Sequence, residues 1–139
     1  WIVEGSLRFD EDGFEWQEHL IVDGERRRWL SVEDDEGTVE TVLWERVPAP
    51  GLDPAGDRVT HEGTTFTLDE RGRARFTSQG STGAPGGGRV EYADFTAGEE
   101  RLGFERYTTD GTWEVSRGRP VPEHSLDVYG GGGAPGAAG

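Results

Sequence analysis

The chain has 139 residues and a formal net charge of −14, because 28 Asp and Glu residues outnumber 14 basic residues, all of which are Arg. A surface of this sign repels phosphate backbones and anionic lipid headgroups, so it argues against nucleic-acid binding and favours cationic or neutral partners. Since the sequence contains no Lys and no Cys, it excludes a Schiff-base lysine, a P-loop lysine, a cysteine nucleophile and a thiolate metal site among these residues.

The first third of the chain predicts a meander of short strands. Apolar and polar side chains alternate in each of them, which is the period of a β-strand. Glycine and acidic residues form the turns between them, as in Asp10–Gly13 and Asp23-Gly24. The predicted strands are residues 1–9, 14–22, 29–33 and 39–47.

A linker and a second set of strands follow. Residues 48–58 contain three prolines and two glycines, which predicts a connector rather than a strand. The Gly-rich residues 80–88 predict a flexible loop, and residues 130–139, which are only Gly, Ala and Pro, predict a disordered tail. We expect a turn at Asp69–Gly72 and strands at residues 59–68, 73–78, 90–95, 102–107, 112–116 and 126–129.

The two parts of the chain, residues 1–47 and 59–129, share a pattern. Matching Glu33 with Glu105 also aligns apolar residues one and three positions earlier in each part. This match predicts an internal duplication, although short β-patterns also recur by coincidence. We therefore predict a single all-β domain over residues 1–129, with about ten short, mostly antiparallel strands in two related meanders that form a sandwich or partly closed barrel with little helix.

Glu18 has the most unusual placement in the sequence. It lies on the same face of its predicted strand as Phe14, Trp16 and Leu20. An unpaired carboxylate there would have a raised pKa and could act as a general acid. The interpretation that we favour is a structural ion pair with an arginine, and the candidates are Arg28, Arg101 and Arg106.

Three further acids, Glu33, Glu105 and Glu114, would converge if the two parts pack about a pseudo-twofold axis. Converging carboxylates fit the acid pair of a glycosidase or a site for a small hard cation, whereas solvated strand ends contain the same residues. The acidic turn at 34–36 lacks the spacing of a calcium loop, and the three histidines lack metal-ligand spacing. We predict no catalytic residue, no metal site and no cofactor.

Tryptophans stand close to acids at three places: Trp29 before Glu33, Trp44 before Glu45 and Trp113 before Glu114. An ammonium or guanidinium group over an indole ring gains about 0.5 to 2 kcal/mol, and a carboxylate adds attraction. Tryptophans at strand spacing are equally typical of a hydrophobic core. The candidate ligand-binding residues are Glu18, Trp29, Glu33, Glu105, Arg106, Trp113 and Glu114.

Several motifs occur in order along the chain: Val3-Glu4-Gly5, Phe14-Glu15-Trp16, Trp29-Leu30-Ser31-Val32-Glu33 and Trp113-Glu114-Val115. From Trp1 to about Tyr129 the chain thereby resembles the bacterial domain of unknown function family 4178. The family has no established activity, so the resemblance implies no catalytic residue. Members begin with an additional Gly-Asp-containing strand, which implies that this first strand is missing here or lies in residues not given. Their gene neighbourhoods imply a link to polyamines or to membrane proteins.

The sequence favours a non-catalytic β-rich binding or scaffold module, located in the cytoplasm and accessory to a polyamine- or membrane-linked system. Its expected partner is a protein or a small cationic ligand. No apolar run reaches the roughly eighteen residues of a spanning helix, so we expect no membrane insertion by this segment. The alternatives are a carboxylate-dependent hydrolase that uses Glu18, Glu33 or Glu105, and a structural assembly subunit.

Overall fold

The computed structural model describes residues 1–107, 111–122 and 125–130. Ten β-strands and no α-helix lie in these residues, which confirms the predicted all-β, mostly antiparallel fold. In the same residues nothing helical is long and apolar enough to cross a membrane. The strands are β1 (Ile2–Glu11), β2 (Phe14–Asp23), β3 (Arg26–Asp35), β4 (Thr38–Arg46), β5 (Arg58–His61), β6 (Thr64–Gly80), β7 (Gly87–Ala97), β8 (Glu100–Arg106), β9 (Glu114–Pro120) and β10 (Tyr129–Gly130).

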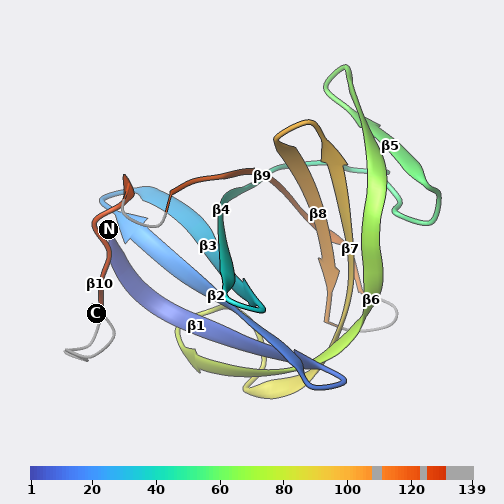
Figure 1. Cartoon of the computed structure of the whole chain (residues 1–139). Coiled ribbons are helices and arrows are strands. Elements are labelled where there is room, and N and C mark those ends of the chain that lie inside the picture. Colours follow the sequence, from blue (N-terminus) through green and yellow to red (C-terminus); the bar gives the residue numbers. More distant parts are fainter. Residues whose placement is uncertain (108–110, 123–124, 131–139) are drawn as a thin grey trace.

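Eight of the strands close into a barrel (Figure 1). Strands β1 to β4 form one antiparallel run and β6 to β9 form another. The two runs join at both edges, because β4 pairs with β9 and β1 pairs with β6. Strand β5 extends the sheet outside β6, and β10 runs parallel to the start of β1. An eight-stranded barrel has an interior just wide enough for side chains or for one small ligand.

The two four-stranded runs have matching registers around the predicted repeat. Glu18 pairs with the residue two positions before Glu33. Asp94 likewise pairs with the residue two positions before Glu105. Aligning Glu33 with Glu105 therefore also aligns Glu18 with Asp94. The internal duplication itself stays a prediction, because similar registers also arise when unrelated meanders close a barrel of the same size.

The predicted turn at Asp69–Gly72 is wrong, because β6 passes through these residues as one long strand. A β-bulge between Leu68 and Glu70 accommodates them: one extra residue bends a strand sharply without ending it. The turn lies instead between β5 and β6, at Glu62 and Gly63, whose φ values of 50° and 80° are both positive. Acidic residues next to glycine thus mark a bulge here and a turn elsewhere.

The C-terminal strand is shorter than predicted. Only Tyr129 and Gly130 pair with β1, in a parallel register, although residues 126–129 were the expected strand. The amino group of Trp1 donates a hydrogen bond to the carbonyl oxygen of Asp127 at 3.0 Å, which holds the last described segment beside the first. Apart from Gly130, the tail predicted at 130–139 lies outside the described residues.

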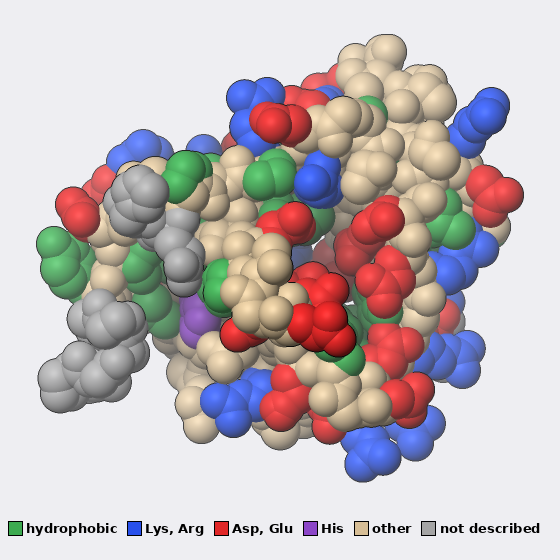
Figure 2. Space-filling view, in the orientation of Figure 1, with side chains coloured by type: hydrophobic (Ala, Val, Ile, Leu, Met, Phe, Trp, Pro, Cys, Tyr) green, Lys and Arg blue, Asp and Glu red, His purple; other side chains and the backbone are tan. Residues whose placement is uncertain are grey.

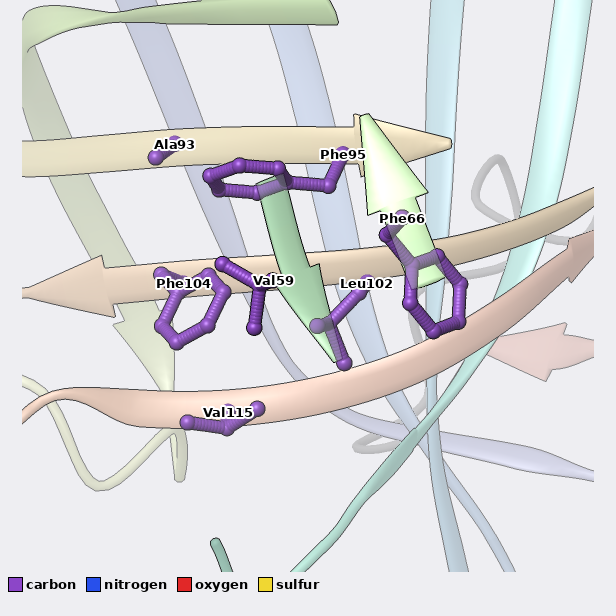
Figure 3. Close-up of a cluster of buried hydrophobic side chains, with 7 residues drawn as sticks. All are labelled: Val59, Phe66, Ala93, Phe95, Leu102, Phe104 and Val115. Atoms are coloured by element: carbon purple, nitrogen blue, oxygen red, sulfur yellow. The ribbon is translucent and has the colours of Figure 1, made fainter. Parts of the chain in front are cut away.

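One part of the hydrophobic core lies outside the barrel wall. Figure 3 shows it between β5 and the outer faces of β7, β8 and β9. Residues 47–57, which contain most of the predicted linker, form no strand and supply Val47, Ala49 and Leu52 to this layer. The buried side chains are Val59, Phe66, Ala93, Phe95, Leu102, Phe104 and Val115. Because this layer uses the outward residues of β7 to β9, their alternate residues point into the barrel.

The second part of the core fills one side of the barrel interior. The ring of Phe9 stacks on Trp16 with centroids 5.1 Å apart, and Trp16 meets Tyr92 edge-on at 5.6 Å. The buried members are Leu7, Phe9, Ala74, Phe76, Val90 and Tyr92. Aromatic rings therefore occupy the wall formed by β1, β2, β6 and β7, and they leave the opposite part of the interior to polar side chains.

Candidate functional site

Carboxyl groups from three strands meet inside the barrel. Strand alternation directs Asp94 of β7 and Glu105 of β8 inward, since their neighbours Ala93 and Phe104 belong to the outer layer. It also directs Glu18 of β2 inward, since Trp16, two positions earlier, packs against the inner core. These carboxyls line a cavity of about 30 Å³, which we call the inner chamber. Its lining residues are Glu18, Trp29, Trp44, Arg46, Asp94, Gly103, Glu105, Glu114 and Ser116.

The carboxyl groups of Glu18 and Glu105 lie close enough for each to shift the pKa of the other. Two carboxylates held together away from water repel each other, so a proton on one of them is favoured. Burial, followed by the charge of Glu105, raises the pKa of Glu18 well above its usual value. Burial also raises the pKa of Glu105, while the interaction with Glu18 opposes that rise. The pKa is raised further at Glu18 than at Glu105, so Glu18 is the member of the pair that binds a proton more readily.

Further acids lie close enough to the inner chamber to affect its carboxyls. Burial raises the pKa of Asp94, and the charges of Glu105 and Glu33 add to the effect. The pKa of Glu33 is raised as well, first by burial and then by Glu40 and Glu70. Figure 2 shows acidic side chains gathered around a hollow in the middle of this face. The interior thus carries closely spaced carboxyls with few cations among them.

Two glycines make room for the indole ring of Trp44, which covers the inner chamber. A Cβ at Gly118 would lie 2.6 Å from Cε3 of Trp44, and a Cβ at Gly103 would lie 3.0 Å from its Cζ3. The indole Nε1 donates a hydrogen bond to Oγ of Ser31 at 2.9 Å. The ring of Trp44 is therefore fixed across the interior between β3 and β9.

A larger cavity of about 590 Å³, which we call the vestibule, lies at the mouth of the barrel next to the inner chamber. Trp29, Arg46 and Glu114 line both cavities. Tyr107 lines the vestibule and donates its hydroxyl hydrogen to Oε1 of Glu105 at 3.2 Å. Between the cavities, Nη1 of Arg46 donates to Oε1 of Glu114 at 3.0 Å. Since Arg46 and Glu114 line both cavities, this ion pair marks the boundary between them, which we call the neck.

Four of the seven candidate residues line the inner chamber: Glu18, Trp29, Glu105 and Glu114. Glu33 lies near enough to raise the pKa of Asp94. The predicted arginine partner of Glu18 is wrong, because no ion pair within the described residues involves Glu18, and its partner is a second carboxyl. An arginine was expected because it would neutralise a buried acid, but here burial beside Glu105 instead raises the pKa of Glu18 and favours its neutral form.

Arg106 and Trp113 lie apart from the inner chamber, on the outside of the barrel. The guanidinium carbon of Arg106 lies 4.3 Å from the centre of the Trp113 ring, and its Nη2 donates to Glu91 at 3.0 Å. Both side chains line an outer cavity of about 530 Å³. Because Arg106 directly follows Glu105 on β8, strand alternation alone separates the two side chains onto opposite faces.

Sequence reasoning missed Asp94, Arg46 and Tyr107. Asp94 had no signal in the sequence alone, since its match with Glu18 depends on strand registers that the fold reveals. Arg46 and Tyr107 had none, because each lies at the end of a strand whose neighbours follow only from barrel closure. In the described residues no group of three or more His, Cys, Asp or Glu side chains has an arrangement that could hold a metal ion.

The comparisons with known proteins agree with the motifs in the chain. A family model described as "Domain of unknown function (DUF4178)" matches residues 1–123. The chain belongs to the DUF4178 family. This DUF4178 chain is 40% identical over 135 residues to the uncharacterised proteins Rv2597 of Mycobacterium tuberculosis and Mb2628 of Mycobacterium bovis. The match covers 93% of the chain but 65% of the length of each of these relatives. No solved structure matches the DUF4178 chain.

Proposed function

We propose that this DUF4178 domain is a binding module that receives a small organic cation in its acidic interior. The observation that carries the proposal is the meeting of Glu18, Asp94 and Glu105 beside two tryptophans in the inner chamber. Only one cationic side chain, Arg46, lines that chamber among the described residues. Burial therefore favours protonation of Glu18 and Asp94, and a bound cation is an alternative way to compensate the charge of these carboxyls.

The inner chamber suits the charged head of such a ligand. A volume of about 30 Å³ is close to the share of one water molecule in the liquid, so it admits an ammonium group but not a whole ligand. Trp29 and Trp44 supply indole faces, over which a cation gains about 0.5 to 2 kcal/mol. The rest of the ligand would extend through the neck into the vestibule.

The sequence-based hypothesis of an accessory role in a polyamine-linked system is compatible with this chemistry, since polyamines carry primary ammonium groups. A membrane-linked role rests on the family resemblance alone. In this proposal, the partner of the binding module is a small cation. The alternative is that the module binds a protein.

Calorimetric titration at pH 7 with ammonium, methylamine, hexylamine and putrescine tests the proposal. We expect saturable binding of at least one amine, and at least tenfold weaker binding when both Glu18→Gln and Glu105→Gln are present. The control is Glu45→Gln, which removes an exposed carboxylate that pairs with Arg28 at 3.6 Å. Absence of binding for every amine by the folded wild-type domain would contradict the proposal, and so would equal weakening by the control.

A hydrolase based on Glu18 and Glu105 is the second candidate, and the observation that favours it is that both carboxyls line the same buried chamber. Two carboxyls that share one proton are the catalytic groups of aspartic proteases. The inner chamber, however, is too small for a scissile bond and an attacking water together. Turnover of peptide or glycoside substrates that disappears in Glu18→Gln would favour this candidate over the binding module.

A further inference from the structure

The vestibule differs in chemical character from the inner chamber that it adjoins. About half of its wall is apolar, and this half comes from β1, β2, β3, the loop after β6 and Tyr107 just after β8. The apolar wall consists of Leu7, Leu20, Trp29, Ala84, Pro85 and Tyr107. A volume of about 590 Å³ is within the usual range for sites that enclose a small organic molecule.

The charges in the vestibule have the opposite balance to those in the chamber. Arg27 and Arg46 line it, and Glu114 is the one carboxylate among the described residues of its lining. Glu114 already pairs with Arg46, and Arg27 donates to Glu4 at 3.2 Å outside the cavity. Within the described part of the lining, a positive charge would therefore face two guanidinium groups and no carboxylate outside an ion pair. This arrangement disfavours a second ammonium group there.

We infer that the ligand is an amphiphilic primary amine, with one ammonium group at the end of an apolar body. This inference rests on the proposed function, because it takes the inner chamber as the seat of the ammonium group. The head passes the neck at Arg46 and Glu114 to reach Glu105, and the body stays against Leu7, Leu20 and the ring of Tyr107. Diamines and polyamines bind less well, since their second charge would lie beside Arg27 and Arg46.

Calorimetric titration with a series of linear amines tests the inference. Each methylene that enters the apolar vestibule should strengthen binding about fourfold, so affinity should rise from butylamine to hexylamine and octylamine. Hexylamine should bind at least tenfold more tightly than 1,6-diaminohexane, which has the same length, and than spermidine. Hexan-1-ol, which lacks the charge, should bind at least tenfold more weakly than hexylamine.

The outcomes separate the inference from the proposed function. Diamines that bind as tightly as monoamines, or an affinity that is independent of chain length, would overturn the amphiphilic ligand and leave cation binding intact. If no amine binds, the proposed function fails and the inference fails with it. Because these measurements use the wild-type domain, they do not depend on the folding of any variant.

A variant that fills the vestibule gives a second test. Ala84 lies in the loop between β6 and β7, where Ala84→Trp should occupy the cavity without disturbing a strand. We expect hexylamine binding to weaken at least tenfold while methylamine binding changes less than twofold. The control, Ala55→Trp, places the same side chain at the outer cavity. Hexylamine binding that is unchanged in a folded Ala84→Trp domain would overturn the inference.

Discussion

The indole ring of Trp44 lies so close to Gly118, its cross-strand partner on β9, that a Cβ at position 118 would come within 2.6 Å of Cε3 of Trp44 and 2.7 Å of its Cδ2. Contacts this short are not tolerated, so the ring or the strand would have to move. Gly103 on β8 faces the same ring. The absence of side chains at these two positions is what allows a tryptophan to cross the barrel and cover the acids beneath it.

Gly118→Ala should therefore destabilise the domain. Overpacking of a well-packed interior typically costs about 1 to 3 kcal/mol, and we expect a loss in that range by chemical denaturation. Gly86→Ala is the matched control, because a Cβ there would meet no atom within 4 Å. A Gly118→Ala domain as stable as the control would mean that Trp44 does not hold this position in solution.

The proton held by Glu18 makes stability depend on pH. The raised pKa means that the folded state keeps this proton at pH values where the unfolded state, with an ordinary value near 4.5, has lost it. Below the pKa of Glu18 in the unfolded state, both states are protonated. As the pH rises above that value, the free energy of unfolding falls, and it stops falling once the pH exceeds the pKa in the folded state. A glutamine at position 18 keeps the hydrogen-bond donor and removes this loss.

We expect Glu18→Gln to be more stable than the wild type at pH 8, by at least about 1 kcal/mol, since one pKa unit corresponds to about 1.4 kcal/mol. The two proteins should be nearly equal in stability at pH 4. Thermal denaturation across this pH range measures the difference, with the exposed Glu15→Gln on the same strand as control. A glutamine variant that is less stable than the wild type at pH 8 would show that Glu18 is ionised in the fold.

The strands could be predicted from the sequence because each depends on the alternation of apolar and polar side chains within one short segment. Alternation placed strands close to β1, β2 and β4, and it identified Glu18 as an acid on an aromatic face. Barrel closure was not readable, since the β1–β6 pairing joins residues such as Phe9 and Phe76 that are far apart in the chain. The same non-local step sets Glu105 against Glu18, so the sequence suggested an arginine as partner where the fold supplies a carboxyl.

Prediction from local composition also failed where the same residues can form either a hairpin turn or a β-bulge. Asp69–Gly72 has the composition of a hairpin turn, but the bulge between Leu68 and Glu70 absorbs the extra residue and β6 continues. Strand alternation correctly describes β8, yet it could not show that Arg106 would face the outer cavity while Glu105 faces inward. Which face of a strand is interior depends on closure, and closure depends on all eight strands.

The outer layer of the core should contribute strongly to stability. Phe66 is fully buried between β5 and the barrel wall, whereas Phe14 on β2 is 39% exposed. Phe66→Ala should cost about 3 to 5 kcal/mol, because it removes a large buried side chain and leaves a cavity. Phe14→Ala should cost much less in the same chemical denaturation experiment. Equal losses would mean that β5 and residues 47–57 do not cover the barrel in solution.

Arg46 competes with the proposed ligand for the acids at the neck. Its guanidinium donates to Glu114 at 3.0 Å, and its charge lowers the pKa of Glu105, opposing the larger effect of burial. An incoming ammonium group must displace this cation, so Arg46→Gln should strengthen hexylamine binding at pH 7, by about tenfold. The control is Arg58→Gln, which changes an exposed arginine on β5. Weaker hexylamine binding by Arg46→Gln would instead mean that Arg46 keeps Glu105 ionised for the ligand, and that the two cations act together rather than in competition.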